Sequence, residues 1–122
     1  MSTVCIVAVK SGDEYKAITV VRGRYNYVYK TLTAWYNTQE RAEALVNHGD
    51  AIYIAERLEP TDYNNHSYDF PEENVCLFFC RDCGDFWNEA KPNVHSREEL
   101  MDVCWCPVYI FEDGEWRVYN KD

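Results

Sequence analysis

The residues best suited to chemistry are four cysteines that form two close pairs in the second half of the chain. Cys80 and Cys83 form a Cys-x-x-Cys that is closed by Gly84, and Cys104 and Cys106 form a Cys-x-Cys further along. Two thiolates this close on a turn reach a common point, so each pair could hold one side of a tetrahedral Zn²⁺ ion. Four thiolates leave the metal no open position, so the spacing predicts a structural zinc rather than a catalytic one.

Two alternatives to this zinc site stay open. Cys76 or His95 could replace one of the ligands, or Cys76, Cys80 and Cys104 could be small buried residues on strands. A redox role for the Cys-x-x-Cys is disfavoured, because that chemistry needs the motif at a helix N-terminus. The residues around Cys83 do not predict such a helix.

A polar stretch from Glu59 to Asn74 predicts a long loop that carries His66 and Tyr68. His66, with Arg81 and Asp82, could bind or hydrolyse a small nucleotide. The alternative is that His66 orders the loop by local hydrogen bonds to the backbone, which we favour. No nucleophile elbow, phosphate loop or paired carboxylates accompany it, so the sequence identifies no catalytic residue and favours a non-enzymatic protein.

In the first quarter of the chain, three alternating tyrosines are bracketed by Arg22, Arg24 and Lys30. Aromatic side chains between basic ones could stack on nucleotides or form a protein interface. The acidity of the chain favours the protein partner. The predicted partner-binding residues are Arg22, Arg24, Tyr25, Tyr27, Tyr29, His66 and Tyr68.

The charge of the chain is strongly negative and unevenly distributed. Its 122 residues carry a formal net charge of −9, and residues 61–122 hold fourteen acidic against five basic side chains. Such a field opposes phosphate, so we expect no direct DNA binding. The acidic half could instead keep the protein soluble or mimic nucleic acid before a basic partner. The chain shows neither a signal peptide nor an apolar run that could span a membrane, so we expect a cytoplasmic protein.

The pattern of strands and helices predicts one α+β domain over residues 1–122. We expect an antiparallel sheet of about five short strands with two to three helices packed on one face, to which the paired cysteines could add a zinc staple. Strands are predicted at 4–9, 15–21, 75–80, 106–111 and 115–119, and helices at 31–36, 40–48 and 97–103, with another helical turn or two within 51–58. Turn residues at 11–14 and at 112–114 predict two hairpins, and the sequences at 37–40 and 96–99 predict helix N-terminal caps. The Tyr25, Tyr27 and Tyr29 alternation would place three phenols on one face if that segment is extended.

Several short motifs resemble those of a family of small bacteriophage and prophage proteins. They are Tyr15-Lys16-Ala17-Ile18, Lys30-Thr31-Leu32, Gly49-Asp50, His66-Ser67-Tyr68-Asp69, Arg81-Asp82-x-Gly84 and Glu112-Asp113-Gly114-Glu115-Trp116. The family pattern has Trp-Asp-Gly-Tyr-Pro where this chain has Val21-Arg22-Gly23-Arg24-Tyr25. It has His-Arg-Asp-Arg-Gly where this chain has Cys80-Arg81-Asp82-Cys83-Gly84. The resemblance implies a phage accessory protein without a defined activity.

Three functional hypotheses follow from these observations. The first is a phage accessory protein that binds and inhibits a host protein, an anti-defence or host-takeover factor whose partner normally handles nucleic acid. The second is a small-nucleotide-binding or nucleotide-hydrolysing protein that uses the His66 loop. The third is a zinc-stapled structural or interaction module.

Overall fold

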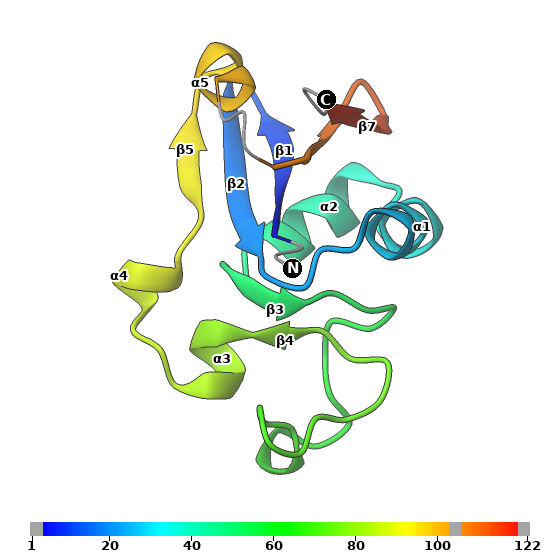
Figure 1. The fold of residues 1–122 in the computed structure, drawn as a ribbon, viewed down its shortest axis with the longest axis vertical. Helices are drawn as coiled ribbons and strands as arrows, with labels where there is room; N and C mark the ends of the chain where they lie inside the picture. The colour runs from blue at the N-terminus through cyan, green and yellow to red at the C-terminus, as the bar shows by residue number, and fades with distance from the viewer. Residues whose placement is uncertain (1–3, 103–105, 120–122) are drawn as a thin grey trace.

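The computed structural model of the chain describes residues 4–102 and 106–119 and shows an α+β fold built on one mixed β-sheet (Figure 1). In chain order the elements are β1 (Cys5–Ser11), β2 (Glu14–Val20), α1 (Tyr25–Trp35), α2 (Gln39–Val46), β3 (Ala51–Tyr53), the 3₁₀ helix η1 (Tyr63–Asn65), β4 (Leu77–Phe78), α3 (Phe79–Cys83), α4 (Trp87–Ala90), β5 (Asn93–His95), α5 (Arg97–Met101), β6 (Val108–Glu112) and β7 (Glu115–Tyr119). Within these residues the seven strands follow the order β4-β3-β2-β1-β6-β7, and β5 also pairs with β2.

The sheet is mixed, so the prediction of five antiparallel strands was wrong. β1 lies at the centre, antiparallel to β2 and parallel to β6. One end of β2 pairs with β3 in parallel, and its other end pairs with β5 in antiparallel orientation. Sequence reasoning finds hairpins between neighbouring strands because their turns are local. The parallel β1–β6 pair joins segments about a hundred residues apart, and no turn motif predicts such a pair.

Two hairpins that the turn residues predict are confirmed. β1 and β2 are joined through Gly12, whose φ is 65°, and β6 and β7 are joined through Asp113 and Gly114, with φ of 54° and 80°. Aspartate tolerates the left-handed conformation and glycine adopts it freely, so Asp-Gly supplies the two positive φ angles of a tight hairpin turn. The two hairpins meet in the sheet through β1 and β6, which pair in parallel.

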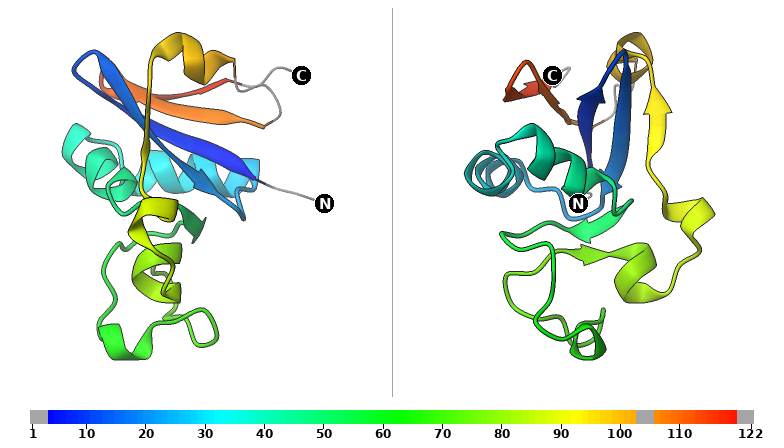
Figure 2. Two further views of the ribbon diagram at one scale, coloured as in Figure 1. Left: turned by 90° about the vertical axis from the view of Figure 1, so that its left-hand side faces the viewer. Right: turned by 180° about the vertical axis from the view of Figure 1, so that it is seen from behind.

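Helices pack on both faces of the sheet, which corrects the prediction that they share one face. On the first face, α1 and α2 contribute Val28, Leu32 and Leu45 to the larger core cluster. On the second face, Leu100 of α5 packs with Ala8 and neighbouring strand residues in a smaller cluster. Figure 2 shows α1 and α2 to one side of β1 and β2, with β5 and α4 to the other. Alternate residues of β1 and β6 point to opposite faces, so both faces need cover.

A buried carboxylate lies at the turn between β6 and β7. Glu112 is only 4% exposed, and it accepts a hydrogen bond of 2.8 Å from the hydroxyl of Tyr15. Arg97 and the hydroxyl of Tyr119 each donate to it at 3.2 Å. Burial raises the pKa of Glu112, but the hydrogen bonds from Arg97 and Tyr15 outweigh it and hold the pKa below its ordinary value.

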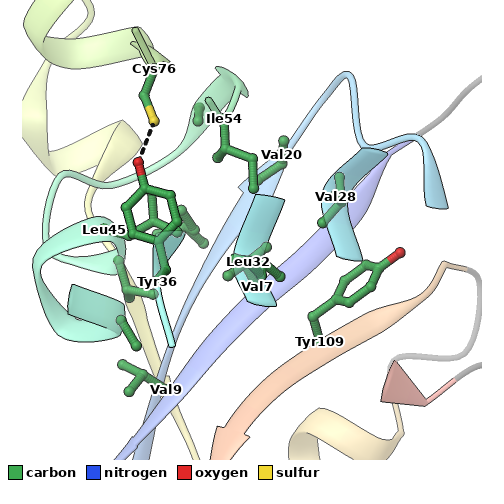
Figure 3. Packing of buried hydrophobic residues seen from close by; sticks show 14 of the residues in the cluster. Val7, Val9, Val20, Val28, Leu32, Tyr36, Leu45, Ile54, Cys76 and Tyr109 are labelled. Carbon is green, nitrogen blue, oxygen red and sulfur yellow. Dashed lines mark hydrogen bonds between the residues drawn. The ribbon is translucent and has the colours of Figure 1, made fainter. Parts of the chain in front are cut away.

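The larger core joins the sheet to the segment that leads toward β4 (Figure 3). Leu32 and Tyr36 follow Val28 at intervals of four, and all three are fully buried. The Tyr36 hydroxyl reaches past the helices to donate to the Ala55 carbonyl at 2.5 Å and lies 3.3 Å from the Cys76 sulfur. Burial of each of these side chains stabilises the fold by roughly 1.5–3 kcal/mol. Because Ala55 precedes the long loop and Cys76 follows it, the contacts of Tyr36 hold the chain on both sides of that loop.

The structure corrects the bounds or the type of three predicted segments. Helix α1 covers residues 25–35, so it begins six residues before the helix predicted at 31–36, and the tyrosine segment is not extended, because burial of Val28, Leu32 and Tyr36 at a spacing of four outweighs the alternation. Residues 51–58 contain β3 instead of a helix, in keeping with their β-branched and aromatic residues. The strand predicted at 75–80 is confined to Leu77–Phe78, after which α3 begins.

Candidate functional site

The structure separates the predicted partner-binding residues into two places, a hollow beside α1 and the loop that precedes β4. The hollow has a volume of about 330 Å³, is open to solvent and is lined by Arg22, Arg24, Tyr27 and Tyr53. Tyr29 does not line it, because residues two apart on a helix point roughly 200° away from each other. The Tyr25 side chain lies outside what the structure describes. Sequence reasoning missed Tyr53, which lies on β3 and has no motif around it.

The two tyrosines of the hollow have different roles. The Tyr27 hydroxyl donates to the Ile54 carbonyl at 2.7 Å, which fixes its ring while 45% of the residue stays exposed. Burial is the main cause that raises the pKa of Tyr53, and the nearby Arg22 lowers it. Arg22 and Tyr53 both line the hollow, so their side chains border the same space.

His66 is buried at the base of the long loop. Its Nδ1 accepts a hydrogen bond of 2.9 Å from the Glu72 N–H, so Nε2 is the nitrogen that carries the proton. That Nε2 lies 2.9 Å from the Cys76 carbonyl oxygen and 3.5 Å from a carboxylate oxygen of Asp82. Both ring nitrogens are occupied within the protein, and this geometry fits the interpretation in which His66 orders the loop. It offers no imidazole atom for direct contact with a partner or for hydrolysis.

Arg81 and Asp82 complete the buried network around His66. Asp82 accepts from the Phe78 N–H at 2.8 Å and from Arg81 Nε at 2.8 Å. Arg81 also donates to the carbonyls of Leu58 at 2.6 Å and of Cys76 at 3.1 Å, which lie on opposite sides of the long loop. The network thus closes the loop at its base, and two motifs that the sequence sets apart, His66 and Arg81-Asp82, meet there.

Further contacts order the rest of this loop. We call the whole loop, residues 59–74, the aromatic loop. Glu72 forms an ion pair with Arg57 and accepts from both the N–H and the hydroxyl of Thr61 at 2.9 Å. The Asp62 side chain accepts from the Asn64 N–H at 2.9 Å and so caps η1. Although the loop has few strand or helix residues, its backbone is held at both ends and in the middle.

The aromatic loop presents three large aromatic side chains to solvent. Tyr63 is 59% exposed, Tyr68 is 55% exposed and Phe70 is 79% exposed. Arg81 lies 5.8 Å from the centre of the Tyr63 ring, within range of a cation–π contact. Of these three residues, only Tyr68 is among the predicted partner-binding residues. The available signal was the presence of three aromatic residues among turn-forming ones in a segment without a core pattern.

The three described cysteines of the predicted zinc site occupy two different parts of the molecule. Cys80 and Cys83 lie on α3 and are half-buried, whereas Cys106 precedes β6 close to Cys5. Phe78, Ala51, Val20 and Cys5 form one registered row across β4, β3, β2 and β1. At roughly 4.8 Å per strand, this row separates Phe78 from Cys5 by about 14 Å. Cys104 lies outside the described residues, so the four-cysteine zinc site stays a prediction.

Other features of the described residues limit the chemistry that they can perform. In residues 4–102 and 106–119, no group of three or more histidine, cysteine or acidic side chains is arranged to hold a metal ion. Burial, and to a lesser degree Cys106, raises the pKa of the Cys5 thiol to about 12, and burial likewise raises that of Cys76. These two thiols are therefore core residues rather than nucleophiles.

Comparisons with protein-family models, with curated proteins and with solved structures gave no match to this chain. The resemblance to phage proteins consequently stays a prediction from the motifs alone. Among the helices of the described ranges, none is long and apolar enough to cross a membrane.

Proposed function

We propose that the protein is a non-enzymatic binding protein that docks on a basic surface of a partner protein through its aromatic loop. In the setting that the phage resemblance implies, the partner is a host protein that handles nucleic acid, and binding inhibits it. The observation that carries this proposal is the exposure of Tyr63, Tyr68 and Phe70 on a loop held by a buried network.

Exposed aromatic residues on an ordered loop suit protein recognition. When an aromatic residue that anchors an interface is replaced by alanine, the binding free energy commonly weakens by about 2 kcal/mol or more. Such anchors cluster at the centre of an interface. A loop that is already ordered loses little conformational entropy when it binds. The His66 network supplies this order, because it ties Leu58 and Cys76 together across the base of the loop. His66 would therefore act as a positioning residue, while Tyr68 contacts the partner.

The charge of the aromatic loop indicates the sign of the partner surface. Residues 59–74 contain five acidic side chains and no lysine or arginine. Glu72 is paired with Arg57, but Asp69 and Glu73 are exposed beside the aromatic residues and have no ion-pair partner among the described residues. Complementary charges steer association, so a basic partner should bind faster at low salt than at high salt.

The test captures proteins from a nuclease-treated bacterial lysate on the immobilised protein and quantifies them by mass spectrometry. The test variant is Tyr68→Ala/Phe70→Ala, and the control is Trp35→Ala, which removes an aromatic residue that is 50% exposed outside the loop. We expect the wild type and the control to retain a basic protein that is eluted by salt. The loop variant should retain at least about tenfold less of that protein. Retention that is equal for wild type and the loop variant would contradict the proposal.

The other two hypotheses gain less from the structure. Nucleotide hydrolysis through the His66 loop finds no free imidazole nitrogen in this arrangement. The zinc-stapled module depends on Cys104, which the structure does not describe, and on Cys106, which lies across the sheet from α3.

A further inference from the structure

We propose that the hollow between α1 and β3 binds a mononucleotide, with Arg22 and Arg24 holding its phosphate and Tyr27 and Tyr53 contacting its base. This site is separate from the aromatic loop, and its ligand class is independent of the protein partner. At about 330 Å³ the hollow lies at the lower end of the roughly 300–1,000 Å³ typical of ligand pockets, which suits a small ligand.

Arginine side chains that are not engaged elsewhere in the described fold gather at this hollow. Of the seven arginines in the chain, all described, five have a recorded side-chain partner within the protein: Arg41 with the Trp35 carbonyl, Arg57 with Glu72, Arg81 with Asp82, and Arg97 and Arg117 with Glu112. Arg22 and Arg24 are exposed and form no ion pair or side-chain hydrogen bond with the described residues. Two guanidinium groups at one hollow present several N–H donors in the planar geometry that matches phosphate.

The backbone around the hollow fixes where these arginines start. The Arg22 N–H donates to the Ile52 carbonyl at 2.7 Å, which ties the segment after β2 to β3. Arg24 is the N-cap of α1, and its side chain does not cap the helix. The first turn of α1 carries no acidic side chain, so the positive end of the helix dipole adds to the field of the two arginines instead of being neutralised.

The tyrosines favour a ligand with a planar ring over a bare anion. Tyr27 is held by its hydrogen bond to Ile54, so its ring is a fixed and partly exposed surface. The Tyr53 side chain lines the hollow together with Arg22, and its hydroxyl has no hydrogen-bond partner in the described residues, so it can donate to or accept from a ligand. Stacking of a base on an aromatic side chain contributes about 1–3 kcal/mol and tolerates different bases.

The experiment titrates the protein with AMP, GMP, CMP and UMP, and with inorganic phosphate and adenosine, by isothermal calorimetry and by amide chemical shifts. We expect at least one mononucleotide to bind with a Kd below about 1 mM. Arg22→Gln and Arg24→Gln should each weaken it by about tenfold or more, because each removes a charge-assisted hydrogen bond. Lys30→Gln is the matched control, since it removes one exposed positive charge of α1 that does not line the hollow.

The controls separate the possible outcomes. Binding of Lys30→Gln within about twofold of wild type, with shifts confined to the hollow, supports the proposal. Absence of binding by all four mononucleotides overturns it, as does an equal loss in Lys30→Gln. If inorganic phosphate binds as tightly as a mononucleotide, the proposed contact between the tyrosines and the base is overturned. A short oligonucleotide is titrated in the same way, and if it binds far more tightly than any mononucleotide, the proposal that the ligand is a mononucleotide is overturned. The loop variant Tyr68→Ala/Phe70→Ala should leave nucleotide binding unchanged, so the site and the proposed partner binding are tested separately.

Discussion

Replacement of His66 by alanine tests the role that the structure gives this residue. If His66 were a surface ligand, His66→Ala would leave the fold intact. The buried ring instead makes hydrogen bonds of 2.9 Å to the Glu72 N–H and to the Cys76 carbonyl. Its loss leaves the Glu72 N–H without a partner, whereas the Cys76 carbonyl keeps its hydrogen bond from Arg81.

The magnitude follows from these contacts. An unsatisfied buried backbone donor costs about 1–3 kcal/mol, and the cavity left by the ring adds to this. We therefore expect His66→Ala to destabilise the loop, and with it the protein, by about 2–4 kcal/mol. The stability of His66→Gln should lie between that of the wild type and that of His66→Ala, because a glutamine amide can replace one of the hydrogen bonds. Tyr68→Ala, on the same loop but exposed, should change stability by less than about 0.5 kcal/mol.

Two measurements are needed because the loop could open without global unfolding. Urea denaturation followed by tryptophan fluorescence gives the free energy of unfolding, and hydrogen exchange of the Glu72 amide reports opening of the loop. The reasoning would be refuted if His66→Ala changed the free energy of unfolding by less than about 0.5 kcal/mol and also left the hydrogen-exchange protection of the Glu72 amide unchanged.

Three further predictions concern other parts of the fold. Gly49→Ala should destabilise by about 2 kcal/mol or more in thermal denaturation, because φ is 85° and a Cβ would overlap the Ala90 carbonyl oxygen. Because folding lowers the pKa of Glu112 from its ordinary value of 4.5, the ionised carboxylate stabilises the folded protein above about pH 4.5. This stability is lost as the pH falls through the pKa of the folded state. The free energy of unfolding in urea should therefore fall less steeply below that pH in Glu112→Gln, and an equal fall would contradict this. For zinc, metal analysis by mass spectrometry should find no effect of Cys106→Ser even if Cys83→Ser removes metal, because Cys106 lies across the sheet from α3.

Local signals in the sequence were reliable where the structure depends on neighbouring residues. The Ser96 capping box is present, with the Glu99 N–H donating to the Ser96 hydroxyl and the Glu99 carboxylate accepting from the Ser96 N–H. Thr38 caps α2 by accepting from the Arg41 N–H. Caps and turns are determined within four or five residues, so they can be predicted without knowledge of the remaining fold.

The signals failed where burial depends on distant partners. His66 lies in a polar segment that predicts exposure, yet Cys76 and Asp82 enclose it. The first part of α1 was not predicted as a helix, because alternation and helical spacing overlap there, and the tertiary contacts of Leu32 decide between them. The hollow joins Arg22 to Tyr53 only because β2 and β3 pair at their ends, which no local pattern indicates.

The central claim is that the aromatic loop is the surface that contacts a partner. It is tested most directly by placing a photo-crosslinking amino acid at position 68 or 70, with position 35 as the exposed control, and irradiating the protein in bacterial lysate. We expect crosslinks from positions 68 and 70 to one basic protein, and none to that protein from position 35. Crosslinks to a common protein from position 35 alone, with none from the loop, would contradict the account.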